Sequence, residues 1–326
     1  MEINERNIKV WSTIGTRATF GMAALELAKK YDDLIVLTCD VSTSAGLDRF
    51  RKTFPEKYID VGIAEQNMIG IAAGLASENY KVITTTFTPF QTARCCEQIK
   101  VNLGYMKNKV CMVGIASGLA LGTLGYTHCS IEDIGIIRSI PGISIISPAD
   151  GLETVKALEA AINHETSCYL RLTGISNNPI IYSKDYKFEI GKSIKLKEGK
   201  DITIICCGAV VHECLRAAEI LETNNVNCKV INMHTIKPID RNVIKEAVKT
   251  KLIVTVEEHN IIGGLGSAVA ECKSELKDAP AQLLLGIKDT YDKGGEYNFL
   301  KEKHGLSSEK IVNDILQKIE FQNEQQ

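Results

Sequence analysis

The feature of this chain that most constrains its fold is a regular alternation of short apolar segments with longer helix-like segments. In the first half, apolar runs of strand length lie at residues 34–39, 82–86, 110–115, 143–147 and 168–172. Helix-like stretches lie beside them at residues 19–30, 63–79, 90–103, 130–139 and 151–163. Continuous apolar runs are typical of strands buried inside a parallel sheet. Their alternation with helices predicts βαβ units and a mostly parallel sheet covered on both faces.

The alternation stops between about residues 176 and 200, where Asn and Pro residues and a charged run interrupt it, and then resumes. The second set of expected strands is 202–207, 228–233, 252–256 and 282–285, and the expected helices are 211–223, 241–250, 265–276 and 308–319. A chain of 326 residues is long enough for two domains of ordinary size. We therefore predict an α/β protein with two doubly wound, mostly parallel domains, residues 1–185 and 186–326.

Composition and charge exclude several classes of partner. The net charge of −2 offers no electrostatic basis for binding nucleic acid or an anionic membrane. No apolar run has the length that a bilayer-spanning helix needs. The N-terminus lacks the basic and apolar regions of a secretory signal. A cytoplasmic location without membrane or nucleic-acid partners is the expectation.

The cysteines do not follow a metal-binding or disulfide pattern. There are 11, two pairs of them are adjacent (95–96 and 206–207), and no C-x-x-C spacing occurs. Most others lie inside the strand-like runs, where cysteine behaves as a small apolar residue. We expect reduced, structural cysteines rather than a disulfide framework or a zinc site.

A carboxylate at the start of a small-residue helix is the first candidate for chemistry. Residues 58–61 are strand-like, Gly62 follows, and Glu65 then opens an Ala/Gly-rich helical segment that ends near Gly74. A helix with small side chains can pack closely, so Glu65 is expected to be carried into a buried place. Burial without a nearby cation favours the protonated carboxyl, which suits a group that exchanges a proton with a ligand. An ordinary first-turn glutamate, favoured by the helix dipole, explains the local segment equally well.

Two aromatic residues and one histidine follow neighbouring strands. Phe87 and Phe90 come directly after the strand at 82–86, at the edge where parallel α/β sheets bind ligands. The two rings are suited to stack on a flat heterocycle, although filling the core is the more common role of such residues. His128 follows a Gly-rich loop and precedes a helix, a position suited to acid–base chemistry or to donation to a substrate oxygen. An ordinary surface histidine remains the alternative.

A second Gly-rich turn lies in the other half, at residues 263–266. It stands between a strand and a helix, where backbone amides bind anions. It does not fit a dinucleotide or P-loop motif. A tight structural turn is the favoured interpretation, with phosphate binding as the alternative.

In this order and at these separations, Glu65, the Phe87/Phe90 pair, His128 and the Gly263 turn resemble the C-terminal half of transketolase. The resemblance covers nearly the whole chain and is also carried by residues 232–240. It implies a pyrimidine-binding domain at about 7–178 and a transketolase C-terminal domain at about 190–319. Each motif is weak alone, and together they are specific to the group that also contains deoxyxylulose-phosphate synthase.

The resemblance also implies a missing part. Family members hold the cofactor diphosphate through Mg²⁺ with a Gly-Asp-Gly segment in an N-terminal domain, and no Gly-Asp-Gly occurs in this chain. The chain therefore resembles the C-terminal subunit of a split transketolase that is active only with a separate N-terminal subunit. Thiamine diphosphate would lie between two polypeptides, with the diphosphate and Mg²⁺ held mainly by the partner. The implied assembly is a heterotetramer with two copies of each subunit.

Roles follow from the resemblance position by position. Glu65 would hydrogen-bond the cofactor pyrimidine, and His128 would lie near the reacting carbons as the second catalytic residue. The other residues expected beside the cofactor are Asp40, Val41, Ile63, Phe87 and Phe90. His128 is thereby also expected to bind the substrate. The far, anionic end of the sugar is expected to meet Arg17, Ser44 and Arg171. No residue of this chain is expected to bind metal.

The chain departs from the family pattern in three places. A His-Asp pair of the family corresponds here to Ala116-Ser117, and Glu-Asp-Gly corresponds to Thr123-Leu124-Gly125. The third aromatic of the pyrimidine pocket corresponds to Ala93. Loss of an Asp that orients a sugar hydroxyl weakens recognition of the usual donor. We therefore expect a modified ketose, deoxygenated or carrying a sulfonate or another anion in place of phosphate.

Three alternatives to the split transketolase remain. The β subunit of a 2-oxoacid dehydrogenase has a similar length and a pyrimidine-contacting glutamate, but Thr127-His128 and residues 258–266 argue against it. Half of a deoxyxylulose-phosphate synthase is a nearer relative, although that enzyme is normally one chain. A non-catalytic, regulatory homologue is permitted by the lost residues and disfavoured by the retained ones.

Overall fold

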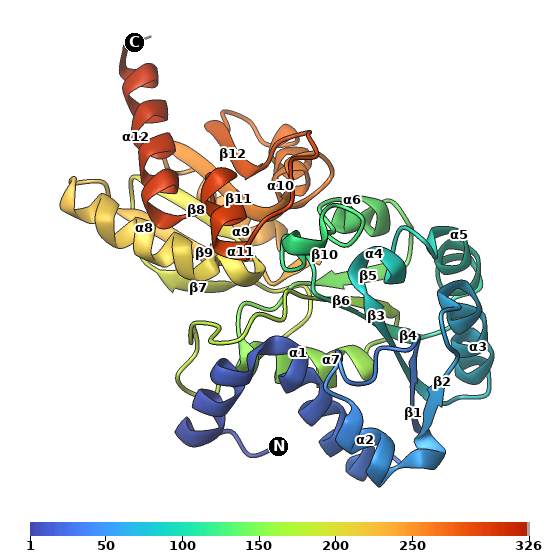
Figure 1. The fold of residues 1–326 in the computed structure, drawn as a ribbon. Helices are drawn as coiled ribbons and strands as arrows, with labels where there is room; N and C mark the ends of the chain where they lie inside the picture. The colour runs from blue at the N-terminus through green and yellow to red at the C-terminus, as the bar shows by residue number, and fades with distance from the viewer. Residues whose placement is uncertain (325–326) are drawn as a thin grey trace.

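The computed structural model of the chain describes residues 1–324. It consists of two α/β units, each built on a twisted and mostly parallel sheet (Figure 1). This confirms the predicted fold class. None of the described helices combines the length and the apolar character that crossing a membrane requires.

The first sheet has seven strands in the order β10-β5-β6-β4-β3-β1-β2. They are β1 (Leu34–Thr38), β2 (Tyr58–Asp60), β3 (Lys81–Phe87), β4 (Val110–Ile115), β5 (Ile143–Ile146), β6 (Ser167–Leu172) and β10 (Thr235–Lys237). All neighbouring pairs are parallel except β10 with β5, which is antiparallel. The central strands β1, β4, β5 and β6 are buried along their whole length, as their apolar sequences predict.

Helices cover both faces of this sheet. One face packs against α1 (Glu5–Lys30), α2 (Asp48–Thr53) and α7 (Gly151–Ile162). The other packs against α3 (Glu65–Ser77), the π-helical η2 (Ile99–Tyr105) and α6 (Asp133–Arg138). Short helical turns, η1 (Pro55–Lys57), α4 (Thr88–Gln91), α5 (Cys96–Gln98) and η3 (Gly122–Leu124), lie in the connections.

The second sheet has five strands in the order β12-β11-β8-β9-β7. They are β7 (Ile194–Lys197), β8 (Ile202–Cys206), β9 (Cys228–Asn232), β11 (Leu252–Asn260) and β12 (Ala281–Ile287). The helices of this unit are η4 (Gly208–Val210), α8 (Val211–Thr223), α9 (Arg241–Ala247), α10 (Leu265–Ser274), α11 (Tyr297–Lys303) and α12 (Ser308–Glu324). In Figure 1, α8 and α12 lie on one face, and α9 and α10 lie toward the first unit.

The two units share a core. Ile134 and Ile137 of α6 belong to the same apolar cluster as Leu265 and Val269 of α10. Strand β10 comes from the second half of the chain but forms the edge of the first sheet. The predicted boundary at 185/186 stays a prediction, because strand pairing crosses it.

Several elements differ from those expected. The helix expected from residue 19 begins at Glu5 and is kinked at Gly15, which has a φ of 79°. The helix expected over 90–103 is divided into α4, α5 and η2, with a turn between α4 and α5. Strands β7 and β10 and helices α2 and α11 were not predicted. The 11 cysteines are free thiols, and all except Cys96 are buried.

Candidate active site

The expected site residues lie at one edge of the first sheet, where its parallel strands end. Asp40 follows β1, Glu65 follows β2, Phe87 ends β3 and His128 lies in the connection after β4. Carboxyl ends of parallel strands meet at the same edge, and ligands of open α/β sheets bind there. The fold therefore brings together residues that are up to 88 positions apart in the sequence.

Glu65 is the first residue of α3 and is buried, with 4% of its surface exposed. Its carboxylate has one partner among the described residues: Oε1 accepts a hydrogen bond of 2.7 Å from Arg94 Nη1. Oε2 accepts none from residues 1–324. The expectation of a buried carboxylate is met, but Arg94 supplies a cation that the sequence interpretation did not include. One oxygen of Glu65 is thus held, and the other is free to meet a ligand.

Arg94 lies in the turn that divides the expected 90–103 helix. Its guanidinium carbon stands 3.9 Å from the centre of the Phe90 ring, a cation–π contact. The backbone carbonyl of Arg94 also accepts a hydrogen bond of 3.1 Å from Gln66 Nε2. The arginine was missed as a site residue, because nothing in the 90–103 sequence indicates that its side chain reaches Glu65.

His128 lies against both aromatic rings. The centre of its ring is 5.4 Å from that of Phe90 and 6.4 Å from that of Phe87, in edge-to-face arrangements. The two phenylalanine rings are themselves 6.4 Å apart. His128 Nδ1 shares a hydrogen bond of 3.0 Å with the Thr127 hydroxyl. Phe87, Phe90 and His128 are all partly exposed, so the rings form an accessible aromatic wall, and Phe87 also packs against the core.

The segment after β1 is tied to the segment after β2 by Asp60. Asp60 Oδ1 accepts hydrogen bonds of 3.0 Å from the amides of both Asp40 and Gly62. Burial disfavours the charge of Asp60, but these amides outweigh that effect and lower its pKa. Asp40 itself has a φ of 56°, a conformation uncommon outside glycine. Asp60 therefore fixes the two short connections that carry the expected cofactor contacts.

The other residues expected beside the cofactor differ in exposure. Val41 is buried next to Asp40, whereas Ile63 leaves 79% of its surface exposed. An isoleucine this exposed, one residue past Gly62 and two before Glu65, offers an apolar surface at the site. The described contacts do not bring Val41 or Ile63 into contact with the aromatic wall.

Arg17, which is expected to bind the anionic end of the sugar, is half-buried. It follows the Gly15 kink of α1, and its side chain lies on Gly174, where an added Cβ would stand 2.2 Å from Arg17 Cγ. Burial lowers the pKa of its guanidinium. Arg17 makes no ion pair or side-chain hydrogen bond with residues 1–324. Ser44 is exposed in the connection after β1.

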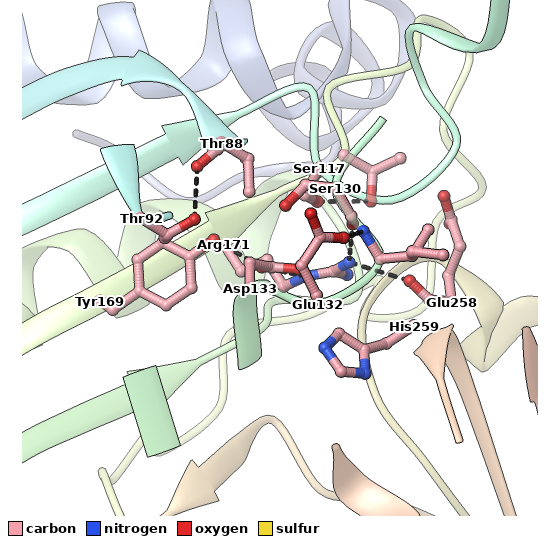
Figure 2. Close-up of polar contacts among 12 residues, drawn as sticks. Thr88, Thr92, Ser117, Ser130, Glu132, Asp133, Tyr169, Arg171, Glu258 and His259 are labelled. Carbon is pink, nitrogen blue, oxygen red and sulfur yellow. Dashed lines mark hydrogen bonds and ion pairs between the residues drawn. The ribbon is translucent and has the colours of Figure 1, made fainter. Parts of the chain in front are cut away.

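Arg171 is buried within β6 and uses its donors inside the protein (Figure 2). Its Nε donates to Asp133 Oδ2 at 2.7 Å, and its Nη2 donates to the carbonyls of Ser130 and Glu258 at 3.3 and 2.9 Å. Asp133 also accepts from the Tyr169 hydroxyl at 2.6 Å. Burial opposes the charge of Asp133, but Arg171 and these bonds outweigh it and hold its pKa below the ordinary value. A substrate contact by Arg171 stays a prediction, and its Nη1 makes no hydrogen bond with residues 1–324.

The second Gly-rich turn is filled by a side chain of the protein itself. Glu257 is buried, and its carboxylate accepts from the amides of Leu265 and Gly266 at 2.6 and 2.8 Å. Burial raises the pKa of Glu257 to about 7, against the effect of these amides. The amides that would bind a phosphate are therefore occupied, which supports the structural interpretation of this turn.

The site is an open wall and not a closed cavity. A cavity of about 340 Å³ lies at the opposite edge of the sheet, beside Lys109 and His164, away from Glu65. In residues 1–324, no cluster of His, Cys, Asp or Glu side chains has the arrangement of a metal site. One wall with a carboxylate, flat rings and a histidine can orient a heterocycle and exchange protons with it. A second surface is needed to enclose a ligand.

Comparison with known proteins gives a consistent assignment for both units. Residues 12–176 match the family described as "Transketolase, pyrimidine binding domain". Residues 191–311 match "Transketolase, C-terminal domain". The two matches together span most of the chain, in the order expected from the sequence.

Individual relatives are similar over nearly their whole length. The chain is 38% identical to a putative transketolase C-terminal section of Methanocaldococcus jannaschii, over 94% of this chain and 96% of that one. It is 38% identical to the 6-deoxy-6-sulfo-D-fructose transketolase subunit SqwH of Clostridium sp., over 91% and 92%. A solved structure described as "Split gene transketolase, inactive beta4 tetramer" superposes with a TM-score of 0.84 at 36% identity, covering 93% of this chain and 98% of that chain.

Proposed function

This chain belongs to the transketolase family, and we propose that it is the C-terminal subunit of a two-subunit transketolase that works only with a separate N-terminal subunit. Relatives that it covers over more than nine-tenths of their length are named as a C-terminal section or as a subunit. The open aromatic wall beside Glu65 fits a cofactor enclosed between two polypeptides. We further propose a heterotetramer located in the cytoplasm.

The observation that carries this proposal is the free oxygen of Glu65 beside two flat rings. Oε1 is bound by Arg94 at 2.7 Å, which leaves Oε2 to meet a ring nitrogen. Phe90 lies beside this ion pair, with its ring centre 3.9 Å from the Arg94 guanidinium carbon, and the centre of the Phe87 ring is 6.4 Å from that of Phe90. A carboxyl group and two rings in this arrangement suit the aminopyrimidine of thiamine diphosphate. The diphosphate and Mg²⁺ would be held mainly by the partner subunit.

The proposed reaction moves a two-carbon ketol unit from a ketose to an aldose. Thiamine diphosphate, when bound, supplies the carbon nucleophile that carries this unit. Glu65 orients the pyrimidine and exchanges a proton with its ring nitrogen. His128, against the aromatic wall, exchanges a proton with an oxygen of the sugar near the reacting carbons. Asp40, Val41 and Ile63 would complete the cofactor contacts.

The far end of the sugar would meet Arg17 and Ser44. Arg17 is a half-buried guanidinium without an acidic partner in residues 1–324, and a guanidinium can give paired hydrogen bonds to a phosphate or a sulfonate. Arg171 would join them through its Nη1, which makes no hydrogen bond with residues 1–324. The proposed donor is a modified anionic ketose, and the name of the Clostridium relative supports this class.

The test is ketol transfer by the assembled enzyme. The chain is co-expressed with an N-terminal transketolase subunit and assayed with thiamine diphosphate and Mg²⁺, as wild type, Glu65→Gln and Glu65→Ala. Activity in the pair, absent from the single chain and lost in both variants, is the expected result. Cofactor binding without transfer to any aldose would contradict the proposed reaction. No cofactor binding by the pair would instead favour a regulatory homologue.

The donor class has its own test with the same complex. Initial rates are compared for xylulose 5-phosphate, fructose 6-phosphate and 6-deoxy-6-sulfofructose. The highest kcat/KM on a modified ketose is expected. The highest value on xylulose 5-phosphate would overturn the donor proposal and leave the reaction class intact. Transfer to a lipoyl domain or turnover of pyruvate would point to the dehydrogenase or synthase alternative.

A further inference from the structure

The loop that carries His128 is tied at its base to the first domain. It runs from β4 to α6 and contains only the short turn η3. The amide and carbonyl of Gly118 exchange hydrogen bonds of 3.0 Å with the carbonyl and amide of Ser130. This bridge closes the loop but does not reach its outer part, from Gly122 to His128.

Glu258 of the second domain holds the beginning of this loop in place. This buried residue of β11 accepts a hydrogen bond of 2.7 Å from the Leu119 amide with Oε1. Its Oε2 accepts one of 2.8 Å from the Tyr297 hydroxyl. The carboxylate also fills the space that a Cβ at Gly118 would need, with Oε1 at 2.2 Å from that position. The conformation of the loop at Gly118 and Leu119 therefore depends on a carboxylate of the second domain.

The outer part of the loop rests on the connection between β12 and α11, residues 288–296. The Gly295 amide donates a hydrogen bond of 2.9 Å to the Gly122 carbonyl. A Cβ at Gly294 would stand 2.5 Å from that carbonyl and 3.3 Å from Gly125 Cα. Two backbones therefore approach as closely as only glycine allows.

Two tyrosines add a second contact between the His128 loop and the 288–296 connection. The rings of Tyr126 and Tyr291 lie 5.3 Å apart in an edge-to-face arrangement. The Tyr126 hydroxyl also shares a hydrogen bond of 3.1 Å with His304 Nε2, just after α11. The loop is thus bound to the second domain on both sides of Gly125.

Gly125 is the residue through which this contact reaches His128. Its φ is 76°, and its carbonyl accepts hydrogen bonds of 3.0 Å from the amides of both His128 and Cys129. A displacement of Gly125 therefore displaces the turn on which the imidazole stands. We propose that the 288–296 connection of the C-terminal domain is a positioning element for His128, with Gly294 as its key residue. This inference rests on the proposed role of His128.

Gly294 is well suited to a test because it has no role in a core. It is exposed and lies in a connection, and its φ is outside the left-handed region, so alanine introduces no backbone strain of its own. Gly295 is the matched control. A Cβ there would meet only side chains, the nearest being Phe299 at 3.0 Å, and Phe299 is 61% exposed. The hydrogen bond from the Gly295 amide to the Gly122 carbonyl is kept.

The experiment compares Gly294→Ala and Gly295→Ala in the assembled enzyme, each alone and combined with His128→Ala. We expect Gly294→Ala to lower kcat by about ten- to a hundred-fold, the range seen for misplacement of a catalytic group by 1 Å. The affinity for thiamine diphosphate is expected to stay at the wild-type value. Gly295→Ala is expected to stay within about twofold of wild type, as surface changes do.

The double variant separates positioning from general loosening of the fold. If Gly294 acts through His128, adding Gly294→Ala to His128→Ala changes kcat by less than about twofold, because the two effects are not additive. Equal losses in both backgrounds, or no loss in wild type, would overturn the inference. A wild-type complex without ketol transfer would instead refute the proposed function, so the two failures are distinguishable.

Discussion

Arg94 donates a hydrogen bond of 2.7 Å to Glu65, and this is the only ion pair that Glu65 makes in residues 1–324. The pair is asymmetric, because the Glu65 side chain is 5% exposed and the Arg94 side chain 41% exposed. The arginine therefore approaches the buried carboxylate from the open side, across the face of Phe90. It holds one oxygen in place and leaves the other toward the site.

The first prediction concerns this pair. Arg94→Met keeps the length of the side chain and its contact with Phe90 but removes the donor that orients Glu65. A hydrogen bond to a charged group contributes about 1.5–3 kcal/mol, so we expect thiamine diphosphate to bind the assembled enzyme at least about tenfold more weakly. Titration calorimetry measures this. Arg241→Met, which removes an exposed ion pair with Glu275, is the control; equal Kd values in the two variants would contradict the prediction.

The second prediction concerns the buried ion pair of Arg171. Asp133→Asn leaves the Arg171 guanidinium buried without its counter-charge. Removal of one partner of a buried pair costs about 3–5 kcal/mol of unfolding free energy. Urea unfolding is the measurement, with Glu271→Gln as the comparison. Glu271 is 62% exposed in its pair with Arg138, so its loss is expected to cost about 1 kcal/mol or less. Equal costs would show that Arg171 is not held as described.

The third prediction concerns pH and His234. Burial lowers the pKa of this histidine from 6.5 to about 4, and its Nε2 has no partner among the described residues. Between these values the unfolded chain binds a proton that the folded chain does not. The contribution to stability is therefore complete above about pH 6.5 and is lost as the pH falls toward about 4.

His234→Gln removes this titration while keeping a polar group near Thr235. From pH 7 to pH 5, the unfolding free energy of the variant is expected to fall by about 2 kcal/mol less than that of wild type. Part of the pH dependence remains, because burial also lowers the pKa of His259 to about 4. Chemical unfolding at the two pH values gives the comparison. Parallel losses in variant and wild type would rule out His234 as a source.

The fourth prediction concerns donor choice. From the family resemblance, Leu124 is expected to stand where the usual pattern has an aspartate, and it is 56% exposed in the loop that carries His128. Leu124→Asp supplies an acceptor for a sugar hydroxyl and is expected to raise kcat/KM for xylulose 5-phosphate relative to a deoxygenated ketose by about tenfold or more. Thr123→Asp adds the same charge one residue away and is the control. The same shift in both variants would assign the effect to charge alone.

Much of the fold could be predicted because the strands carry their own signal. Residues 34–38 and 110–115 are buried on both faces and are accordingly almost entirely apolar. Strand β10 could not be found in this way. It has three residues, one of them a lysine, and exists because β5 offers it an edge in a sheet formed by a different part of the chain.

The candidate site likewise contains residues that the local sequence could indicate and contacts that it could not. Glu65, Phe87, Phe90 and His128 could be proposed from their positions after strands and from the family resemblance, and the structure brings the aromatic rings and the histidine together. Partnerships between distant residues were not visible. Arg171 was expected at the substrate, yet its Nε and Nη2 meet Asp133, Ser130 and Glu258, which only the folded chain places together. The sequence likewise contained Arg94 without indicating that its side chain turns back to Glu65.

Strand β10 has a consequence for recombination between members of the family. A crossover in the 176–200 stretch would combine a β5 edge from one parent with a β10 from another. It would also pair the loop at Gly122 from one parent with the connection at Gly294 from the other. These two backbones approach so closely that they fit only if both loops come from compatible sequences. Chimeras made at the apparent junction are therefore expected to fail more often than chimeras made within either half. New sugar specificities in this lineage should then arise by substitutions in loops rather than by exchange of whole domains.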